Sequence, residues 1–231
     1  MSTLFGAREG ASAVDNGVDL VKLARTIWSE MPLLMAANLL LTFGISISLL
    51  IGLTIPPLGP ILAAVLIGPV WLGTVAACDG ILGNQGPGWR DLLAGIRHHA
   101  PTAIGISLVP ATVGTILLLS LDLVGRHHDQ RWLWLPIGVD AVVLTVLMLG
   151  AFTIFPLAVS STSSGRERWI EALGLAGKHL TATLGMASLL VLLGLSIRYT
   201  GPFFALVMSA PIAMLSTAVV RGYVGRIEES N

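Results

Sequence analysis

The sequence predicts an all-α membrane protein, a helical bundle with six transmembrane helices and amphipathic helices at the membrane surface. Of its 231 residues, 54% are hydrophobic and only 11% are charged, and the mean hydropathy is +0.84. Soluble domains carry about 25% charged residues, so this chain has too few charges to cover a globular surface in water. Six long apolar runs and a repeated sequence unit are the other two observations behind this prediction.

The six apolar runs are the predicted transmembrane helices. A bilayer core about 30 Å thick requires about 20 apolar residues in a helix. Runs that reach or approach this length cover residues 31–53, 60–81, 101–123, 132–159, 183–197 and 202–220. Paired prolines, Pro56 and Pro57, separate the first two runs because proline cannot continue a helix. Loops rich in Gly, Pro or Ser follow the second and fourth runs, and Pro110 and Pro211 interrupt the third and sixth.

Three shorter segments, 17–30, 89–100 and 168–180, are amphipathic. Each has apolar residues three and four apart, which places them on one face of a helix. Each also contains a tryptophan, a residue that favours the headgroup level, and directly precedes an apolar run. We therefore expect helices that lie in the plane of the membrane interface.

A unit that occurs twice, 80 residues apart, organises the chain into modules. At this offset Trp89 matches Trp169 and Asp91 matches Glu171. Repetition of this kind indicates that one structural unit is used more than once. Within a single membrane domain of residues 1–231, we predict modules at 89–159 and 168–220, each with an interfacial helix and two spans. Residues 17–82 resemble them only loosely and are a hypothetical first module.

The distribution of positive residues predicts the orientation. With six spans, ten of the 13 Lys and Arg residues fall on the side of both termini and the amphipathic helices, and three fall on the other. Positive residues stay in the cytoplasm, so both termini are expected there. The first 30 residues contain charges and no signal peptide, so the first span is expected to act as an uncleaved anchor.

Composition and motifs argue against several classes of function. The net charge is zero, which gives no basic surface for nucleic acid. A single cysteine, Cys78, excludes an intramolecular disulfide. The five histidines fall on both predicted sides of the membrane, so we expect no metal site and no cofactor. Sequence motifs of catalytic serine, phosphate-loop and zinc enzymes are missing, so we predict no enzymatic activity.

Two polar residues inside the spans are candidate functional residues. Asp140 lies eight residues into the fourth run, about 12 Å along a helix, where a charge is costly and usually functional. A structural hydrogen bond or a water-filled funnel would also explain Asp140. Asn38 in the first run is expected to form a hydrogen bond between helices. Gly44, Ser48 and Gly52 repeat every four residues and predict a face for close helix packing.

The chain resembles the YesL-like bacterial membrane proteins, a family of uncharacterised function. The resemblance rests on Asn38 in the first span, the joint at 56–60, Gly68-Pro69 in the second span, and the Trp-Arg-Asp-Leu-Leu-Ala-Gly-Ile-Arg helix at 89–97. It covers roughly residues 20 to 225. The chain departs from that family in having Leu92, His98 and His99 where more aromatic and basic residues are usual. The resemblance implies six spans in the bacterial inner membrane and an association with carbohydrate uptake of the ATP-binding-cassette type.

Two hypotheses for function follow. In the first, the chain is a non-enzymatic accessory protein, whose amphipathic helices contact permease or ATPase subunits of an uptake system or simply cover the bundle. The second is that the chain is itself a transporter or permease subunit, with Asp140 beside the path. Neither hypothesis fixes an oligomeric state. The candidate interaction residues on the amphipathic helices are Trp89, Arg90, Asp91, Arg97, Trp169, Glu171 and Lys178.

Overall fold

The computed structural model describes residues 28–83, 86, 88–126, 134–160, 165–178, 180–200 and 205–230. Nearly all of these residues are helical, which confirms the predicted all-α class. The helices are α2 (Met31–Thr54), α3 (Leu58–Leu82), α4 (Trp89–Arg126), α5 (Trp134–Ser160), α6 (Gly165–Lys178), α7 (Leu180–Thr200) and α8 (Ala205–Ser230). The predicted amphipathic helix at 17–30 lies almost entirely outside the described residues.

Helices α2 to α5 are long and apolar enough to cross a membrane, with a mean hydropathy of 2.1 to 2.5 in their most apolar windows. Their apolar residues point both inward and outward. On α2, Leu34 and Leu41 are buried, whereas Leu39 and Phe43 are 61% and 66% exposed. A helix that is apolar on all sides and exposed on one of them suits a lipid environment. The chain is therefore a membrane protein, with four candidate spans in its described part.

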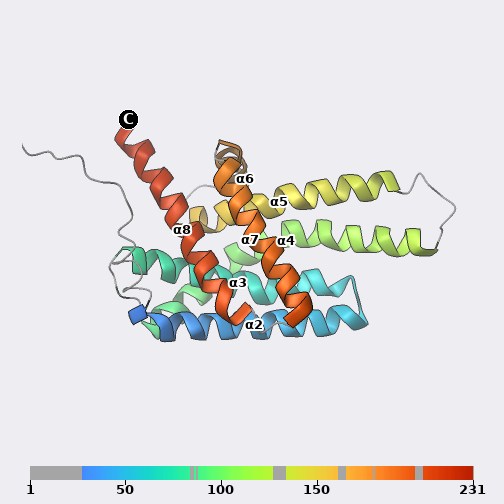
Figure 1. The fold of residues 1–231 in the computed structure, drawn as a ribbon, viewed down its shortest axis with the longest axis horizontal. Helices are drawn as coiled ribbons and strands as arrows, with labels where there is room; N and C mark the ends of the chain where they lie inside the picture. The colour runs from blue at the N-terminus through green and yellow to red at the C-terminus, as the bar shows by residue number, and fades with distance from the viewer. Residues whose placement is uncertain are drawn as a thin grey trace, which may run out of the picture.

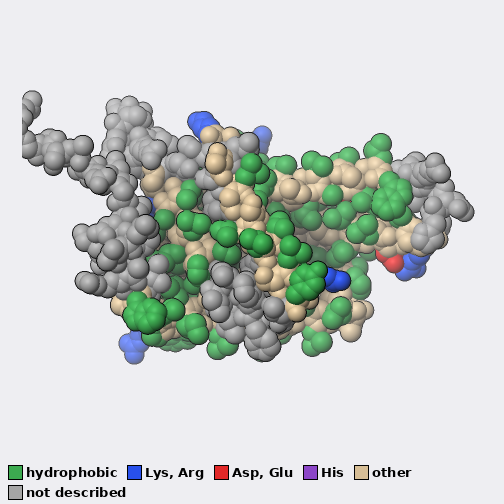
Figure 2. Space-filling view, viewed as in Figure 1, with side chains coloured by type: hydrophobic (Ala, Val, Ile, Leu, Met, Phe, Trp, Pro, Cys, Tyr) green, Lys and Arg blue, Asp and Glu red, His purple; other side chains and the backbone are tan. Residues whose placement is uncertain are grey.

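The four candidate spans run back and forth beside one another, with α3 in contact with α2, α4, α5 and α8 (Figure 1). Helices α7 and α8 cross the direction of these four obliquely (Figure 1). In the space-filling view, hydrophobic side chains cover much of the described surface, and the few charged side chains visible lie near helix ends (Figure 2).

Close backbone contact joins α2 to α3. A Cβ added at Gly52 would lie 3.2 Å from the Cα of Gly59, so neither position has room for a larger residue. A Cβ at Gly44 would touch Ile67, and Ser48 is buried with its hydroxyl donating to the Gly44 carbonyl. The small-residue face that the sequence predicts on the first span is thus confirmed as the surface that packs on α3.

Helix α4 differs from the sequence prediction of an interfacial helix followed by a separate span. It is continuous over 38 residues, or about 57 Å, with Pro101 and Pro110 inside it. Proline is tolerated in membrane helices because neighbouring groups satisfy the freed backbone. In the next module, α6 ends at Lys178 and α7 begins at Leu180.

An ion pair attaches α8 to the end of α3. The Arg221 Nε lies 2.7 Å from an Asp79 carboxylate oxygen. At the opposite end of the bundle, Arg126 pairs with Asp122 within α4. Asp79 and Arg221 are 142 positions apart in sequence (221 − 79), which is why the sequence alone suggests no partner for either.

Candidate functional site: a cavity in the bundle and two docked helices

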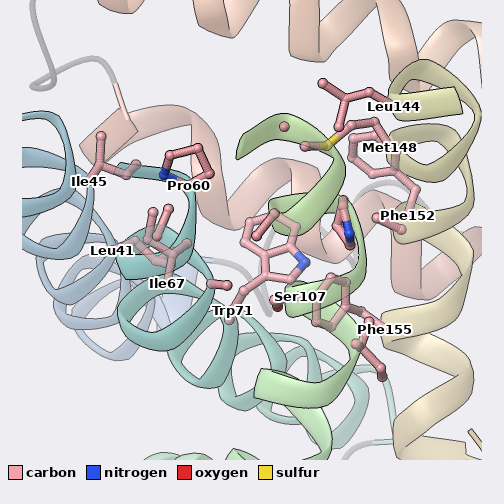
Figure 3. A pocket seen from close by; sticks show the side chains of 18 of the residues that line it. Leu41, Ile45, Pro60, Ile67, Trp71, Ser107, Leu144, Met148, Phe152 and Phe155 are labelled. Carbon is pink, nitrogen blue, oxygen red and sulfur yellow. The ribbon is translucent and has the colours of Figure 1, made fainter. Parts of the chain in front are cut away.

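An apolar cavity of about 550 Å³ lies between α2, α3, α4, α5 and α8. Trp71 stands among the side chains that line it, with Ile45 and Leu41 on one side and Phe152 and Phe155 on the other (Figure 3). The lining from α2 and α3 is Leu41, Ile45, Pro60, Ala63, Ala64, Ile67, Gly68 and Trp71. The lining from α4, α5 and α8 is Ile106, Ser107, Pro110, Ala111, Gly114, Leu117, Leu118, Leu144, Met148, Ala151, Phe152, Phe155, Ser209 and Ile212.

Small residues on facing helices leave this space open. Ala63 and Ala64 on α3 and Ala111 and Gly114 on α4 are among the residues that line the cavity. A Cβ at Gly114 would reach only ordinary contact with Pro60, at 3.8 Å. Closer to Trp71, α3 and α4 come into direct contact, as the Ser107 side chain lies against Gly68. This contact forms part of the wall between α3 and α4, and the cavity continues beyond it to Trp71.

A second hollow of about 410 Å³ continues the cavity toward the joint between α2 and α3. The two share five lining residues: Ile45, Pro60, Ala63, Ile67 and Leu118. The rim of the second hollow reaches the molecular surface, since Leu49 is 49% exposed and Leu53 82% exposed. The two hollows are therefore adjacent along the helices, and together they are called the slot below.

The chemistry of the slot is that of hydrocarbon. No charged residue is among its described lining, and the side-chain hydroxyls are those of Ser48, Ser107 and Ser209. Known small-molecule sites have volumes of about 300–1,000 Å³, a range that includes each hollow. In the part of the chain that is described, no group of three or more His, Cys, Asp or Glu side chains comes together as a metal site would require. The slot is suited to an uncharged, apolar occupant.

Asp140, the candidate from the fourth span, lies outside the cavity. The Thr115 hydroxyl donates to the Pro57 carbonyl, so Thr115 on α4 marks the level of the joint between α2 and α3. Val124 packs on Ile137, which places Asp140 about one turn from that contact and beyond the level of Thr115. The α4–α5 hairpin extends past the α2–α3 joint there, as Figure 1 shows, and Asp140 is half-buried in this extension.

Asn38, the other intramembrane candidate, is buried, with 3% of its surface exposed. It lies on the face of α2 between Leu34 and Leu41, which are themselves 4% and 1% exposed. This face packs on α3 and α8. Its position fits the predicted role of a polar contact between helices, and it places Asn38 away from the slot lining.

The amphipathic start of α4 packs onto the bundle through its apolar side. Leu92 is 1% exposed and clusters with Leu33, Ala37 and Ala77, and Ile96 packs against this cluster. The outer side carries charges, with Arg90 and Arg97 exposed. Trp89 is 47% exposed.

Asp91 has a structural role at the same place. One of its carboxylate oxygens accepts a hydrogen bond from the Gly88 N–H at 2.8 Å. Gly88 also accepts the first turn's hydrogen bonds through its carbonyl, from the N–H groups of Asp91 and Leu92. An acidic residue three positions inside a helix that binds back to the first residue is a capping interaction, so Asp91 fixes where α4 begins.

The amphipathic helix α6 packs onto α5 in a comparable way. Trp169 and Leu173 sit over Gly150, where an added Cβ would lie 3.1 Å and 2.9 Å from their side chains. The buried Thr153 hydroxyl donates to the Ala172 carbonyl at 3.0 Å. Ala172 is fully buried and occupies the position that matches Leu92 at the repeat offset.

The outer side of α6 presents Glu171 and Lys178, both exposed. Arg168 differs from the sequence expectation. The charge of Arg168 predicts a place on the polar side of the helix, but this residue is only 8% exposed. The sequence pattern could not tell whether Arg168 is buried or exposed, because a spacing of three and four residues defines a broad helix face rather than individual contacts.

Comparison with other proteins adds nothing to this geometry. No known protein family, curated protein or solved structure matches the chain. The resemblance to YesL-like proteins therefore stays a prediction, and the arrangement of the residues has to carry the functional argument.

The slot is the feature that sequence reasoning missed. Its signal was present as small residues spaced three and four apart on two spans, Ala64 with Gly68 and Ala111 with Gly114. The same pattern also arises where helices pack closely, as at Gly52 and Gly59. Only the relative placement of the helices distinguishes a filled contact from a hollow one.

Proposed function

We propose that the chain is a non-enzymatic accessory subunit of a solute-uptake system in the bacterial cytoplasmic membrane. In this proposal it has six spans with both termini in the cytoplasm, and it contacts permease or ATPase subunits of an ATP-binding-cassette importer of carbohydrates or other solutes. The resemblance to YesL-like proteins is the reason for proposing an importer of the ATP-binding-cassette type.

One observation carries the accessory role. Both amphipathic segments, at the start of α4 and in α6, use their apolar sides to pack on the bundle. Their charged sides, with Arg90 and Arg97 on one and Glu171 and Lys178 on the other, therefore stay exposed in a fixed position. A helix that only floats at the interface would instead turn its apolar side to lipid. Fixed rows of charge suit recognition of a protein partner.

Both charged rows belong to the same end of the bundle. α4 begins shortly after α3 ends, α6 begins shortly after α5 ends, and α3 and α5 run in the same direction. The positive-inside distribution assigns this end to the cytoplasm. α7 with 21 residues and α8 with 26 residues have the length of the fifth and sixth spans that the proposal requires.

A transporter role for the chain itself has less support. Asp140 does not line the slot, and the slot offers no charged group to a polar solute. We expect Asp140→Asn to leave uptake and partner binding unchanged, with Asp122→Asn as the matched control in the same hairpin. Loss of uptake in the Asp140 variant alone, with the protein still present in the membrane, would instead support a transport path past this residue.

The proposal is tested by purifying the tagged protein in mild detergent at native expression level and identifying the proteins that come with it. Charge reversal at Arg90 and Arg97, or at Glu171 and Lys178, is expected to remove an importer subunit from the purified material. Arg126→Glu, at the opposite end, is the control and should retain it. Recovery of the unmodified chain without any importer subunit would contradict the proposal.

A further inference from the structure

We propose that the slot holds one hydrocarbon chain of a bilayer phospholipid, from the leaflet on the side of the α2–α3 joint. This inference concerns a lipid ligand and is independent of the protein partner proposed above. It rests on the dimensions, lining and position of the slot.

The length of the slot matches one leaflet. On α3 its lining runs from Gly59 in the second hollow to Trp71 in the first, a distance of 12 residues (71 − 59), or about 18 Å along a helix. Half of a bilayer core is about 15 Å. A chain that enters at the joint would therefore reach the level of Trp71 near its terminal methyl group.

The lining excludes the other simple occupants. Water requires two to four polar partners, which the middle of the slot lacks because Ala63, Ile67 and Leu118 line it there. An empty space of this size would forfeit the packing contacts of every wall residue. A charged ligand would find no counter-charge among the described lining residues. A hydrocarbon chain would make packing contacts with the apolar wall residues, and such chains are present at high concentration around a membrane protein.

The position of the opening selects the leaflet. The exposed rim residues Leu49 and Leu53 lie in the last two turns of α2, close to the joint. Ser107 packed on Gly68 closes the wall between α3 and α4, about one turn before Trp71. The exposed rim at Leu49 and Leu53 admits a chain from the end near the joint, with its headgroup outside at that level.

Trp71 allows a direct test, because bromine atoms on a lipid chain quench tryptophan fluorescence on contact. The other five of the six tryptophans are changed to Phe, and the protein is placed in phosphatidylcholine vesicles. The lipids carry bromine either near the headgroup or near the end of the chain. Trp71 is half-buried and packs against buried side chains of α5 and α8, so variants that fill the slot are needed to distinguish a chain in the slot from lipid at the surface. We expect stronger quenching from bromine near the chain end.

Filling the slot provides the matched comparison. Gly114→Leu adds a side chain inside the slot, and Gly105→Leu adds the same side chain to α4 where no atom lies within 4 Å of the added Cβ. We expect Gly114→Leu to lose most of the quenching and Gly105→Leu to retain it. If Gly114→Leu does not fold, Ala63→Leu, which lines both hollows, replaces it.

Two results would overturn the inference. Equal quenching in the unmodified and slot-filled proteins would mean that the lipid reaches Trp71 from elsewhere. Absence of quenching in the unmodified protein would mean that no lipid chain occupies the slot. If quenching is absent and a cysteine placed at Leu53 cross-links two copies of the chain, a second copy would be the occupant instead.

Discussion

Single glycine positions decide how closely the helices approach. Gly73 is the sharpest case in the contact between α3 and the start of α4. A Cβ there would overlap the Ile96 side chain and lie 3.1 Å from the Ile96 backbone nitrogen. Side chains can rotate away from such a contact, but a backbone nitrogen cannot move without displacing the helix.

Gly73→Ala should therefore destabilise the protein by about 1–3 kcal/mol, the usual effect of overpacking. Gly105→Ala is the control, because its Cβ meets nothing within 4 Å and alanine favours helix by up to about 1 kcal/mol. The free energy of unfolding in mixed micelles, measured by titration with a denaturing detergent, distinguishes the two. Equal stability of both variants would show that α4 does not pack on Gly73.

Residue-level roles were only partly accessible from the sequence. The small-residue face around Gly44 and Gly52 was predicted correctly because a spacing of four is a local property of one helix. The capping role of Asp91 was also local, yet its charge suggested a partner surface instead. Burial of Arg168 and the Asp79–Arg221 pair depend on residues brought together by the whole fold, and no local pattern specifies them.

At the level of elements, apolar length predicted the first two helices well, and four of the six predicted spans correspond to candidate spans in the described part of the chain. The runs at 31–53 and 60–81 correspond to α2 and α3 to within about two residues, because a break at Pro56–Pro57 is encoded in the chain itself. The boundary expected at Pro101 was wrong, since α4 continues through it. A proline marks the end of a helix only where its neighbours do not satisfy the freed carbonyl.

The docking of α6 on α5 makes a prediction about a single hydroxyl group. Thr153→Val removes the hydrogen bond to the Ala172 carbonyl and keeps the shape of the side chain. Loss of one such bond costs about 1 kcal/mol, so hydrogen exchange of the α6 amides should accelerate about five-fold. Mass spectrometry of the protein in lipid nanodiscs measures this rate.

Thr145→Val is the matched control for Thr153, because the Thr145 hydroxyl is exposed and donates to the Ala141 carbonyl within the same helix, α5. Its substitution should leave α6 unchanged. Exchange in α6 that is the same in both variants would mean that Thr153 does not hold the helix in place.

At the level of the whole molecule, the prediction concerns sidedness and the number of spans. Cys78 is the single cysteine and is buried, so a Cys78→Ala background allows cysteines to be placed singly at exposed sites. Arg126→Cys and Arg198→Cys should react with a membrane-impermeant maleimide in intact cells. Glu171→Cys should react only after the membrane is opened.

Arg198 distinguishes six spans from four. It lies in the last turn of α7, so it reaches the outside only if α7 crosses the membrane. Reaction of Arg198→Cys only after opening, together with outside reaction of Arg126→Cys, would place α7 and α8 on the cytoplasmic side of a four-span bundle. Helices α7 and α8 cross the direction of α2 to α5 obliquely (Figure 1), so labelling has to decide whether they cross the membrane.

The continuity of α4 has a thermodynamic consequence. One helix carries both Arg90 and Arg97 at its exposed start and Ile106, Ala111 and Gly114 in the wall of the slot. Two ligands that each favour a different tilt of this helix must influence one another's affinity by the same factor, because such linkage is reciprocal. If binding of a partner at the charged start of α4 shifts the helix, the lipid in the slot becomes an effector of that binding. The lipid composition of the bilayer would then change the affinity for the partner from a site that the partner does not contact.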